Sequence, residues 1–405
     1  MVKFIHTADL HLNSPFKGLA HMDRDLLNQV KASTFDAFAR VVDQALDQEV
    51  DFVLIAGDLF DLASRSIYAQ VFLKDQFTRL QEAGIPVFIG FGNHDYVADQ
   101  RFYLDFPDNV TIFPDQVTTH YLESKAGEKV AITGFSYHQQ HIAKNMLASF
   151  PARDKQVDYH LGLYHGDLAS QSQDYAPFQK EDIARLHYHY LALGHIHFFH
   201  QVFPDLPAYY PGNTQGRHIN EKGQKGALLV TLQGPNHQVS FFPTASLEWD
   251  EWDLPVTDQD TINSVHQALL DRSEMCIRDR ALLDRFAGKK TYQIIRVNFL
   301  VHDQAGKDLA DQLSADKLNE LVLDQDLWLK DRKIIWQAKQ DKLASLYPRA
   351  WQEAVTSLKR TGLDGYLNIL KQKIDESYLK DLESSSRQAD LVDQAKQLLD
   401  QEDKG

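Results

Sequence analysis

Five apolar segments of this chain each end in a short turn that carries carboxylate, imidazole or amide side chains. The five turns are Asp9-x-His11, Gly57-Asp58-x-x-Asp61, Gly92-Asn93-His94-Asp95, His165-Gly166-Asp167 and Gly194-His195-x-His197. Residues two apart in an extended segment point the same way, so Asp9 and His11 can converge on one point. The same holds for His195 and His197. The set contains no thiolate and suits divalent ions such as Mn, Fe, Zn or Mg. We therefore predict a metal site built at the ends of several strands.

Each of these turns has an ordinary alternative when it is taken alone. A Gly-Asp pair after a strand is usually a turn with a solvated carboxylate. An isolated Asp-x-His is usually a loop, and His195 and His197 can also be half-buried strand residues. The repetition of one construction five times favours the metal site.

The spacing of apolar residues predicts alternating strands and helices in the first part of the chain. We expect strands at residues 3–8, 52–56 and 86–91, with helices at 25–48 and 67–83 between them. This alternation is typical of βαβ units, in which buried strands lie between helical layers.

Further strands are expected after this βαβ region. They are short and hairpin-like at 110–113, 120–122 and 130–133, and buried at 159–164 and 190–193. Two further β segments, 227–232 and 239–242, are expected to close the domain. A sheet built twice, with helices outside, predicts a four-layer α/β/β/α sandwich.

The composition changes after residue 247, which we take as the end of a first domain over residues 1–247. Residues 248–260 are acidic and contain Pro255, and we expect a linker there. Residues 261–343 include a clear strand pattern at 292–301 and predict a small α/β cap domain. Residues 344–405 predict a helical C-terminal region, either a solvated helical surface or a subdomain packed on the cap.

A five-residue repeat interrupts the predicted cap. Residues 268–272 recur word for word at 281–285. Residues 273–285 resemble translated sequencing-adapter read-through, which makes them an inserted segment; the alternative is a genuine duplicated helical turn. The single cysteine, Cys276, lies inside this segment, so the chain cannot form an internal disulfide and we assign Cys276 no chemistry.

The charge balance constrains the partners. The chain has 42 Lys and Arg against 57 Asp and Glu, a formal net charge of −15. A free-standing nucleic-acid binder is normally basic, because phosphate contacts supply most non-specific affinity. If DNA is bound, bound metal cations, local basic patches or a partner protein must supply the attraction. No apolar run approaches the roughly 20 residues that span a bilayer. We expect a cytoplasmic protein without a membrane partner.

In all five turns the chain resembles the calcineurin-like binuclear metallophosphoesterase superfamily, and the resemblance spans residues 1–247. It implies that Asp9, His11, Asp58 and His197 hold one divalent ion, and that Asp58, Asn93, His165 and His195 hold the other. The two ions, expected to be Mn with Fe, Zn or Mg as alternatives, would activate a water for phosphoester hydrolysis.

The resemblance also assigns residues beside the ions. His94 matches the catalytic histidine of the family, which protonates the leaving oxygen or stabilises charge there. Asp61 matches the carboxylate that orients this imidazole, and the alternative for Asp61 is a helix N-cap. Asp95 and Asp167 are expected to support the loops rather than to touch metal.

Residues 4–12, 57–61 and 210–218 resemble SbcD-like DNA repair nucleases, in particular the YhaO-like branch. This resemblance implies a metal-dependent DNA nuclease, an exonuclease in DNA repair, that forms a homodimer and works with an SMC-like ATPase. In the turn at 210–218, Arg217 can approach a phosphate, and a plain connecting loop is an equal alternative. A phosphodiesterase or phosphatase acting on a small nucleotide, and a non-catalytic scaffold, share the five turns and stay open as alternatives.

Overall fold

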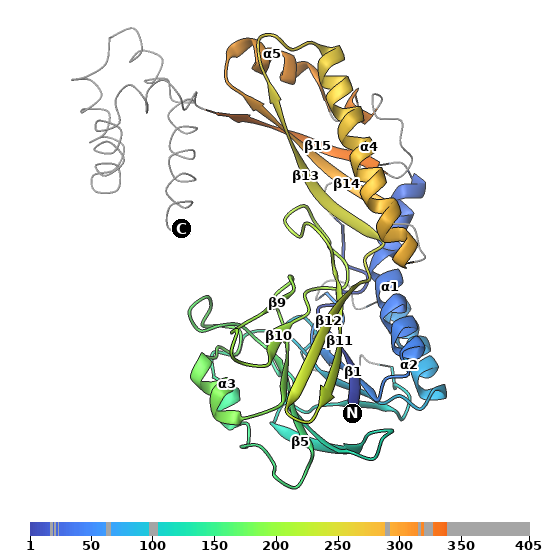
Figure 1. Cartoon of the computed structure of the whole chain (residues 1–405), viewed down its shortest axis with the longest axis vertical. Coiled ribbons are helices and arrows are strands. Elements are labelled where there is room, and N and C mark those ends of the chain that lie inside the picture. The colour runs from blue at the N-terminus through green and yellow to red at the C-terminus, as the bar shows by residue number, and fades with distance from the viewer. Residues whose placement is uncertain are drawn as a thin grey trace, which may run out of the picture. The chain divides into compact units, whose positions relative to one another are not determined.

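The computed structural model describes residues 1–16, 19, 22, 24–61, 66–96, 104–287, 292–314, 317–319 and 327–337 (Figure 1). The chain divides into two compact units, Met1–Phe299 with Ala305–Ile334, and Leu300–Gln304 with Ile335–Gly405. The elements below lie in the first unit, apart from residues 300, 301, 304, 335 and 336.

The first sheet has six strands in the order β12-β11-β1-β2-β3-β4. They are β1 (Val2–Thr7), β2 (Phe52–Ala56), β3 (Val87–Gly90), β4 (Val110–Ile112), β11 (Gly226–Gln233) and β12 (Asn236–Pro243). Strands β1 to β4 run parallel, so their carboxyl ends meet at one edge of the sheet. The hairpin character expected for residues 110–113 is wrong, because β4 pairs in parallel with β3 and thereby extends the sheet.

Two helices, α1 (Arg24–Asp47) and α2 (Ile67–Glu82), connect the parallel strands and contact each other (Figure 1). Their bounds lie close to the predicted ones. Successive residues of β2 face opposite ways: Val53 and Ile55 pack in the cluster that contains helix residues, whereas Leu54 packs toward the second sheet. Burial on both faces explains why this strand is an uninterrupted apolar run.

The second sheet has the order β5-β6-β7-β8-β10-β9. Its strands are β5 (Thr118–Glu123), β6 (Lys129–Gly134), β7 (Tyr159–His165), β8 (Tyr190–Gly194), β9 (His200–Gln201) and β10 (Ala208–Tyr210). Strands β5 and β6 form the expected hairpin, and β6, β7, β8 and β10 run parallel. The short helix α3 (Lys180–Leu186) and the 3-10 turn η2 (Leu147–Ser149), both absent from the sequence prediction, pack on the outer face of this sheet.

The two sheets pack face to face through one apolar cluster that includes Phe4, Phe52, Leu161 and Tyr190. They approach closely at the carboxyl ends of β2 and β8. A Cβ atom on Gly194 would overlap the carbonyl oxygen of Ala56, so only glycine allows this approach. Helices α1 and α2 pack on the first sheet, the two sheets face each other, and α3 and η2 pack on the second sheet, so the fold is α/β and the strand ends of both sheets lie together.

Beyond β12, the chain forms a three-stranded sheet in the order β13-β14-β15. The strands are β13 (Leu247–Val256), β14 (Tyr292–Val301) and β15 (Leu327–Trp336), with helices α4 (Ile262–Ala287) and α5 (Gln304–Gln312). Most of the segment expected to be a linker, residues 248–260, is therefore strand β13. Its acidic side chains suggested a linker, but Trp249 and Trp252 are both buried.

The remaining domain predictions keep their status as predictions. Helix α4 runs through both copies of the repeat at 268–272 and 281–285. The predicted helical region at 344–405 lies outside the described residues. Within the described ranges, no helix is both long and apolar enough to cross a membrane.

Candidate metal centre

The five predicted turns lie at the carboxyl ends of β1, β2, β3, β7 and β8, three on one sheet and two on the other. Backbone hydrogen bonds hold the first two turns in register. The Asp9 N–H donates to Gly57 O at 3.0 Å, and the His11 N–H donates to Asp58 O at 2.9 Å. The His195 N–H donates to the Asp9 carboxylate at 3.1 Å, which ties the second sheet to the first.

The backbone at these turns is strained where the side chains must be aimed. Asp9, His11, Asp58 and His195 have φ values of 51°, 42°, 53° and 111°. Positive φ is costly for residues other than glycine, so the surrounding hydrogen bonds and packing must hold these conformations. Such strain is typical of functional sites.

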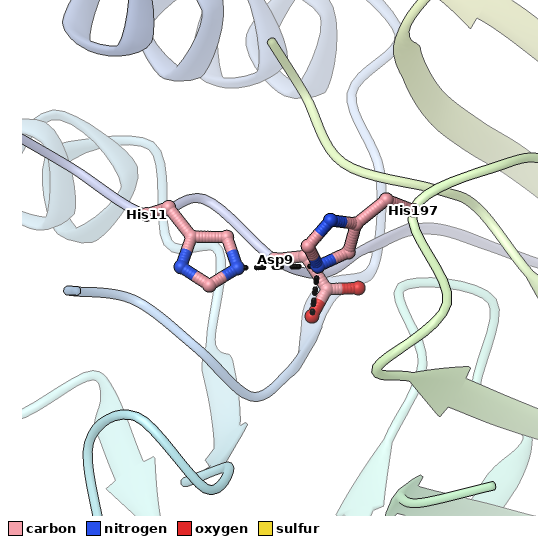
Figure 2. A group of neighbouring side chains, drawn as sticks. All are labelled: Asp9, His11 and His197. Atoms are coloured by element: carbon pink, nitrogen blue, oxygen red, sulfur yellow. Dashed lines mark hydrogen bonds and ion pairs between the residues drawn. The ribbon is translucent and has the colours of Figure 1, made fainter. Parts of the chain in front are cut away.

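Asp9, His11 and His197 form a first group of converging ligands. Figure 2 shows the two imidazoles and the carboxylate pointing toward one another. The Nε2 atoms of His11 and His197 are 3.3 Å apart, and His197 Nε2 is 4.0 Å from Asp9 Oδ1. These ligand atoms are close enough to share one ion.

Asp9, Asp58 and His165 form a second group. His165 Nδ1 lies 2.9 Å from Ala56 O and therefore donates its proton there, which leaves the Nε2 lone pair facing the centre. Asp58 Oδ2 is 3.6 Å from His11 Nε2 and 3.7 Å from His165 Nε2. Asp58 thus lies between the two groups, the place that the family resemblance implies for a bridging ligand.

Asn93 and His195 complete the second group. Asn93 Oδ1 is 3.0 Å from His165 Nε2 and 3.2 Å from His195 Nδ1. All seven side chains that the sequence predicted as metal ligands are therefore brought together. Their coordination of two ions stays a prediction.

The cluster has the chemistry of a site for cations. Asp9 and Asp58 are buried, and burial together with the charge of Asp58 raises the pKa of Asp9 well above its usual value. Burial and the charge of Arg217 hold the pKa of His11 well below its usual range. The Nδ1 atom of His11 is buried without a hydrogen-bond partner in the described part of the chain. Nearby cations would stabilise ionised carboxylates and neutral imidazoles, so these residues fit two divalent ions.

A glycine leaves room beside these ligands. A Cβ atom on Gly92 would overlap Oδ1 of Asp58 and crowd the ring of His165. Burial and the imidazole of His165 lower the pKa of His195 to about 3, so His195 is a neutral donor at physiological pH. The space and the protonation states both suit metal ligation.

His94 and Asp61 form a pair beside the buried cluster. His94 Nδ1 is 3.2 Å from Asp61 Oδ1, and the His94 N–H donates to Asp58 Oδ1 at 2.9 Å. Burial lowers the pKa of His94, but the hydrogen bond to Asp61 and the charge of Asp58 outweigh it and raise the pKa overall. The alternative for Asp61, an N-cap just before residue 62, falls on residues 62–65, which lie outside the described residues.

Comparison with known proteins places this geometry in a family. Residues 2–199 match the family model described as calcineurin-like phosphoesterase. A Bacillus subtilis (strain 168) protein named "Uncharacterized metallophosphoesterase YhaO" is 33% identical over 385 residues, which cover 94% of this chain and 88% of that protein. This chain belongs to the calcineurin-like metallophosphoesterase family.

More distant metallophosphoesterase relatives carry a functional name. The DNA double-strand break repair protein Mre11 of Methanocaldococcus jannaschii is 24% identical over 347 residues, which cover 79% of this chain and 89% of that protein. The Mre11 protein of Sulfurisphaera tokodaii is 27% identical over 208 residues, covering 48% of this chain and 49% of its own length. As a family member with clustered Asp and His ligands, this chain is a metal-dependent phosphoesterase.

Sequence reasoning identified some supporting residues of this metallophosphoesterase and missed others. Asp95 supports the loops as expected, because it accepts the N–H groups of Leu59 at 2.5 Å and Gly92 at 2.6 Å. Glu221 was missed, although its Oε1 is 2.7 Å from His197 Nδ1. Burial raises the pKa of Glu221, but its contacts with His197 and Arg217 outweigh burial and lower it overall. The only signal in the sequence was an acidic residue four positions after Arg217, in a turn without a preceding metal-type motif.

Proposed function

We propose that this metallophosphoesterase is a Mn-dependent DNA nuclease that hydrolyses phosphodiester bonds, acts as an exonuclease and serves in DNA repair. The observation that carries the proposal is the convergence of carboxylates and imidazoles from both sheets beside the His94–Asp61 pair. The sequence similarity to proteins named for DNA double-strand break repair supports DNA as the substrate class.

In this proposal each residue has a defined task. Two divalent ions would be held by Asp9, His11, Asp58, Asn93, His165, His195 and His197. Such ions supply activation of water and neutralisation of charge on the transferring phosphoryl group.

The protein's own acid is His94. Its Nδ1 faces Asp61, so the other ring nitrogen can hold the proton that the leaving oxygen needs. Asp61 fixes the tautomer and orientation of the imidazole, and Ser14 Oγ donates to Asp61 Oδ2 at 3.1 Å and holds that carboxylate. The His94 N–H bond to Asp58 keeps this acid next to the predicted ligands.

The proposed assembly contains a homodimer and an SMC-like ATPase. With a formal net charge of −15, the chain has little general attraction for DNA. A partner with a basic surface would supply that attraction. We expect the ATPase to increase DNA cleavage at physiological salt more than it increases hydrolysis of a small phosphodiester.

The test is hydrolysis by purified protein, with its metal content measured, in Mn²⁺. Substrates are linear duplex DNA, single-stranded DNA and bis-p-nitrophenyl phosphate, each with and without a co-expressed SMC-like ATPase. Release of mononucleotides or short products from DNA ends supports the proposal. Hydrolysis of the small ester without any DNA cleavage, even with the ATPase, rejects it.

A phosphodiesterase or phosphatase acting on a small nucleotide is the second candidate. The same net charge of −15 favours it, because a small substrate needs no extended basic surface. The three-stranded sheet β13-β14-β15 favours the nuclease, since hydrolysis of a small ester does not require an additional sheet. Steady-state kinetics on cyclic and linear mononucleotides would separate the two candidates.

A further inference from the structure

Glu221 is buried, and both of its carboxylate oxygens make polar contacts. Its side chain is 6% exposed. Oε1 lies 2.7 Å from His197 Nδ1 and 3.2 Å from Arg217 Nη2. Oε2 accepts hydrogen bonds from the backbone N–H of Arg217 at 2.7 Å and from Asn213 Nδ2 at 3.0 Å. Both carboxylate oxygens are therefore held in place.

The contact with His197 determines how that imidazole is used. A carboxylate at Nδ1 keeps the proton on Nδ1, which leaves the lone pair on Nε2. Nε2 is the atom that faces Asp9 and His11 (Figure 2). The backbone is fixed as well, because Lys225 Nζ donates to His197 O at 2.6 Å. Glu221 thus sets both the tautomer and the direction of this predicted ligand.

Arg217 connects Glu221 to the His94–Asp61 pair. Its Nη1 is 3.8 Å from Asp61 Oδ2, and Asp61 Oδ1 is 3.2 Å from His94 Nδ1. One guanidinium thus lies between the carboxylate that contacts His197 and the carboxylate that contacts His94. The planar fork of Arg suits this double contact, which a Lys ammonium would not reproduce.

We propose that Glu221 and Arg217 are positioning residues that join His197 to the His94–Asp61 pair. Glu221 holds His197 ready for one of the two ions, and Arg217 sets the orientation of Asp61 and through it that of His94. This inference rests on the proposed metal centre. It differs from a purely structural role of the turn, which predicts loss of folding without selective loss of one ion.

The first test is Mn²⁺ binding by E221Q, measured by calorimetric titration and by electron paramagnetic resonance. We expect one of the two ions to bind about 10- to 100-fold more weakly and the other to be unaffected, as is usual when a carboxylate behind a ligand histidine is lost. The spectrum of a coupled ion pair should give way to that of a single ion at limiting metal. E221D, which keeps the charge, should weaken the same ion less.

The matched control is E251Q, which removes the charge of a glutamate paired with Lys222 and Arg296. It should bind both ions as the wild type does. Thermal unfolding in chelator checks that each variant folds. Wild-type affinity for both ions in E221Q and E221D overturns the role of Glu221, and so does equal weakening of both ions.

The second test is R217Q, assayed on bis-p-nitrophenyl phosphate. We expect nearly unchanged Mn²⁺ affinity, a kcat lowered about tenfold and an unchanged KM, because Asp61 and His94 lose their support while the ligands remain. An unchanged kcat overturns the role of Arg217. Wild-type protein that binds two ions but cleaves no DNA refutes the proposed nuclease and leaves this inference intact, whereas wild-type protein that never binds two ions refutes both.

Discussion

Asp9 with His11, and Asp61 with His94, are two carboxylate–imidazole sets within the same centre that behave in opposite ways. Asp9 and His11 are fully buried, whereas the side chains of Asp61 and His94 are 20% and 31% exposed. The pKa of Asp9 is raised by burial and by Asp58, and that of His11 is lowered by burial. The hydrogen bond between His94 and Asp61 lowers the pKa of Asp61 and helps to raise that of His94.

The difference teaches what each set lacks. Both buried groups are driven toward their uncharged forms, so this part of the centre needs cations to become complete. The exposed pair supplies its own opposite charges and can keep a proton available beside the ions. Burial and the choice of partner, not residue type, separate ligand chemistry from acid chemistry.

The largest change is expected at Asp58, between the two groups of ligands. D58N should lose both ions and lower phosphodiester hydrolysis by roughly 10³-fold or more, because activation of water depends on them. Elemental analysis and the hydrolysis assay measure this. Retention of two ions with full activity would contradict the bridging position.

The same variant should behave oppositely without metal. The raised pKa of Asp9 means that the folded state of the metal-free protein keeps a proton that the unfolded state releases, so stability falls as pH rises above about 4. D58N removes the charge of Asp58, which contributes to that raised pKa, and should make this loss smaller. Urea unfolding in chelator across pH 4 to 8 measures the slope. An unchanged slope would count against charge repulsion between Asp9 and Asp58.

The next largest change tests the exposed pair. H94A should lower turnover by about 10²- to 10⁴-fold, because the leaving oxygen loses its proton donor. Both ions should remain, since none of the predicted ligands is removed. Metal analysis and kcat on one protein preparation give both answers. A fully active H94A assigns the acid role to another group.

D61N should have a smaller effect, about 10- to 100-fold on kcat, because it removes only the partner that orients His94. It should also move the pH profile. Asp61 raises the pKa of His94, and an acid is active only while protonated. Wild-type activity should therefore persist to higher pH than that of D61N, whose alkaline limb moves to lower pH. Identical limbs would show that His94 does not act as the acid.

The smallest change tests a buried histidine outside the centre. His160 contacts Thr133 Oγ1 at 2.8 Å, accepts the Asp154 N–H at 2.9 Å, and burial lowers its pKa to about 4. The unfolded chain takes up a proton below pH 6.5 that the folded protein refuses, so stability should fall between pH 6.5 and about 4. H160Q should flatten this decline and leave metal binding unchanged. Loss of metal binding in H160Q would instead show that His160 contributes to the metal centre.

The parts of the fold that depend on local pattern were predictable from the sequence. The run at 52–56 is apolar because both faces of β2 are buried, and α2 is recognised from its spacing and its end at Gly84. The clustering of the predicted ligands was foreseeable because they lie at or soon after the carboxyl ends of five strands.

What could not be predicted depends on contacts between distant segments. The acidic sequence of β13 suggested a linker, and only the folded structure shows that Trp249 and Trp252 are buried. Glu221 has no motif of its own, and its importance comes from a histidine 24 residues away. The pairing of β4 with β3 likewise depends on a tertiary contact, since strand length does not specify a parallel partner.

The tight approach of Gly194 to Ala56 has a consequence for how the protein assembles. The predicted ligands come from both sheets. A partly folded chain in which only one sheet has formed therefore has only some of these ligands in place. Ion binding during refolding should therefore occur later than formation of secondary structure. It should report the step at which the two sheets pack together. A bulkier residue at position 194 should therefore delay or prevent ion binding during refolding, even if every predicted ligand were intact.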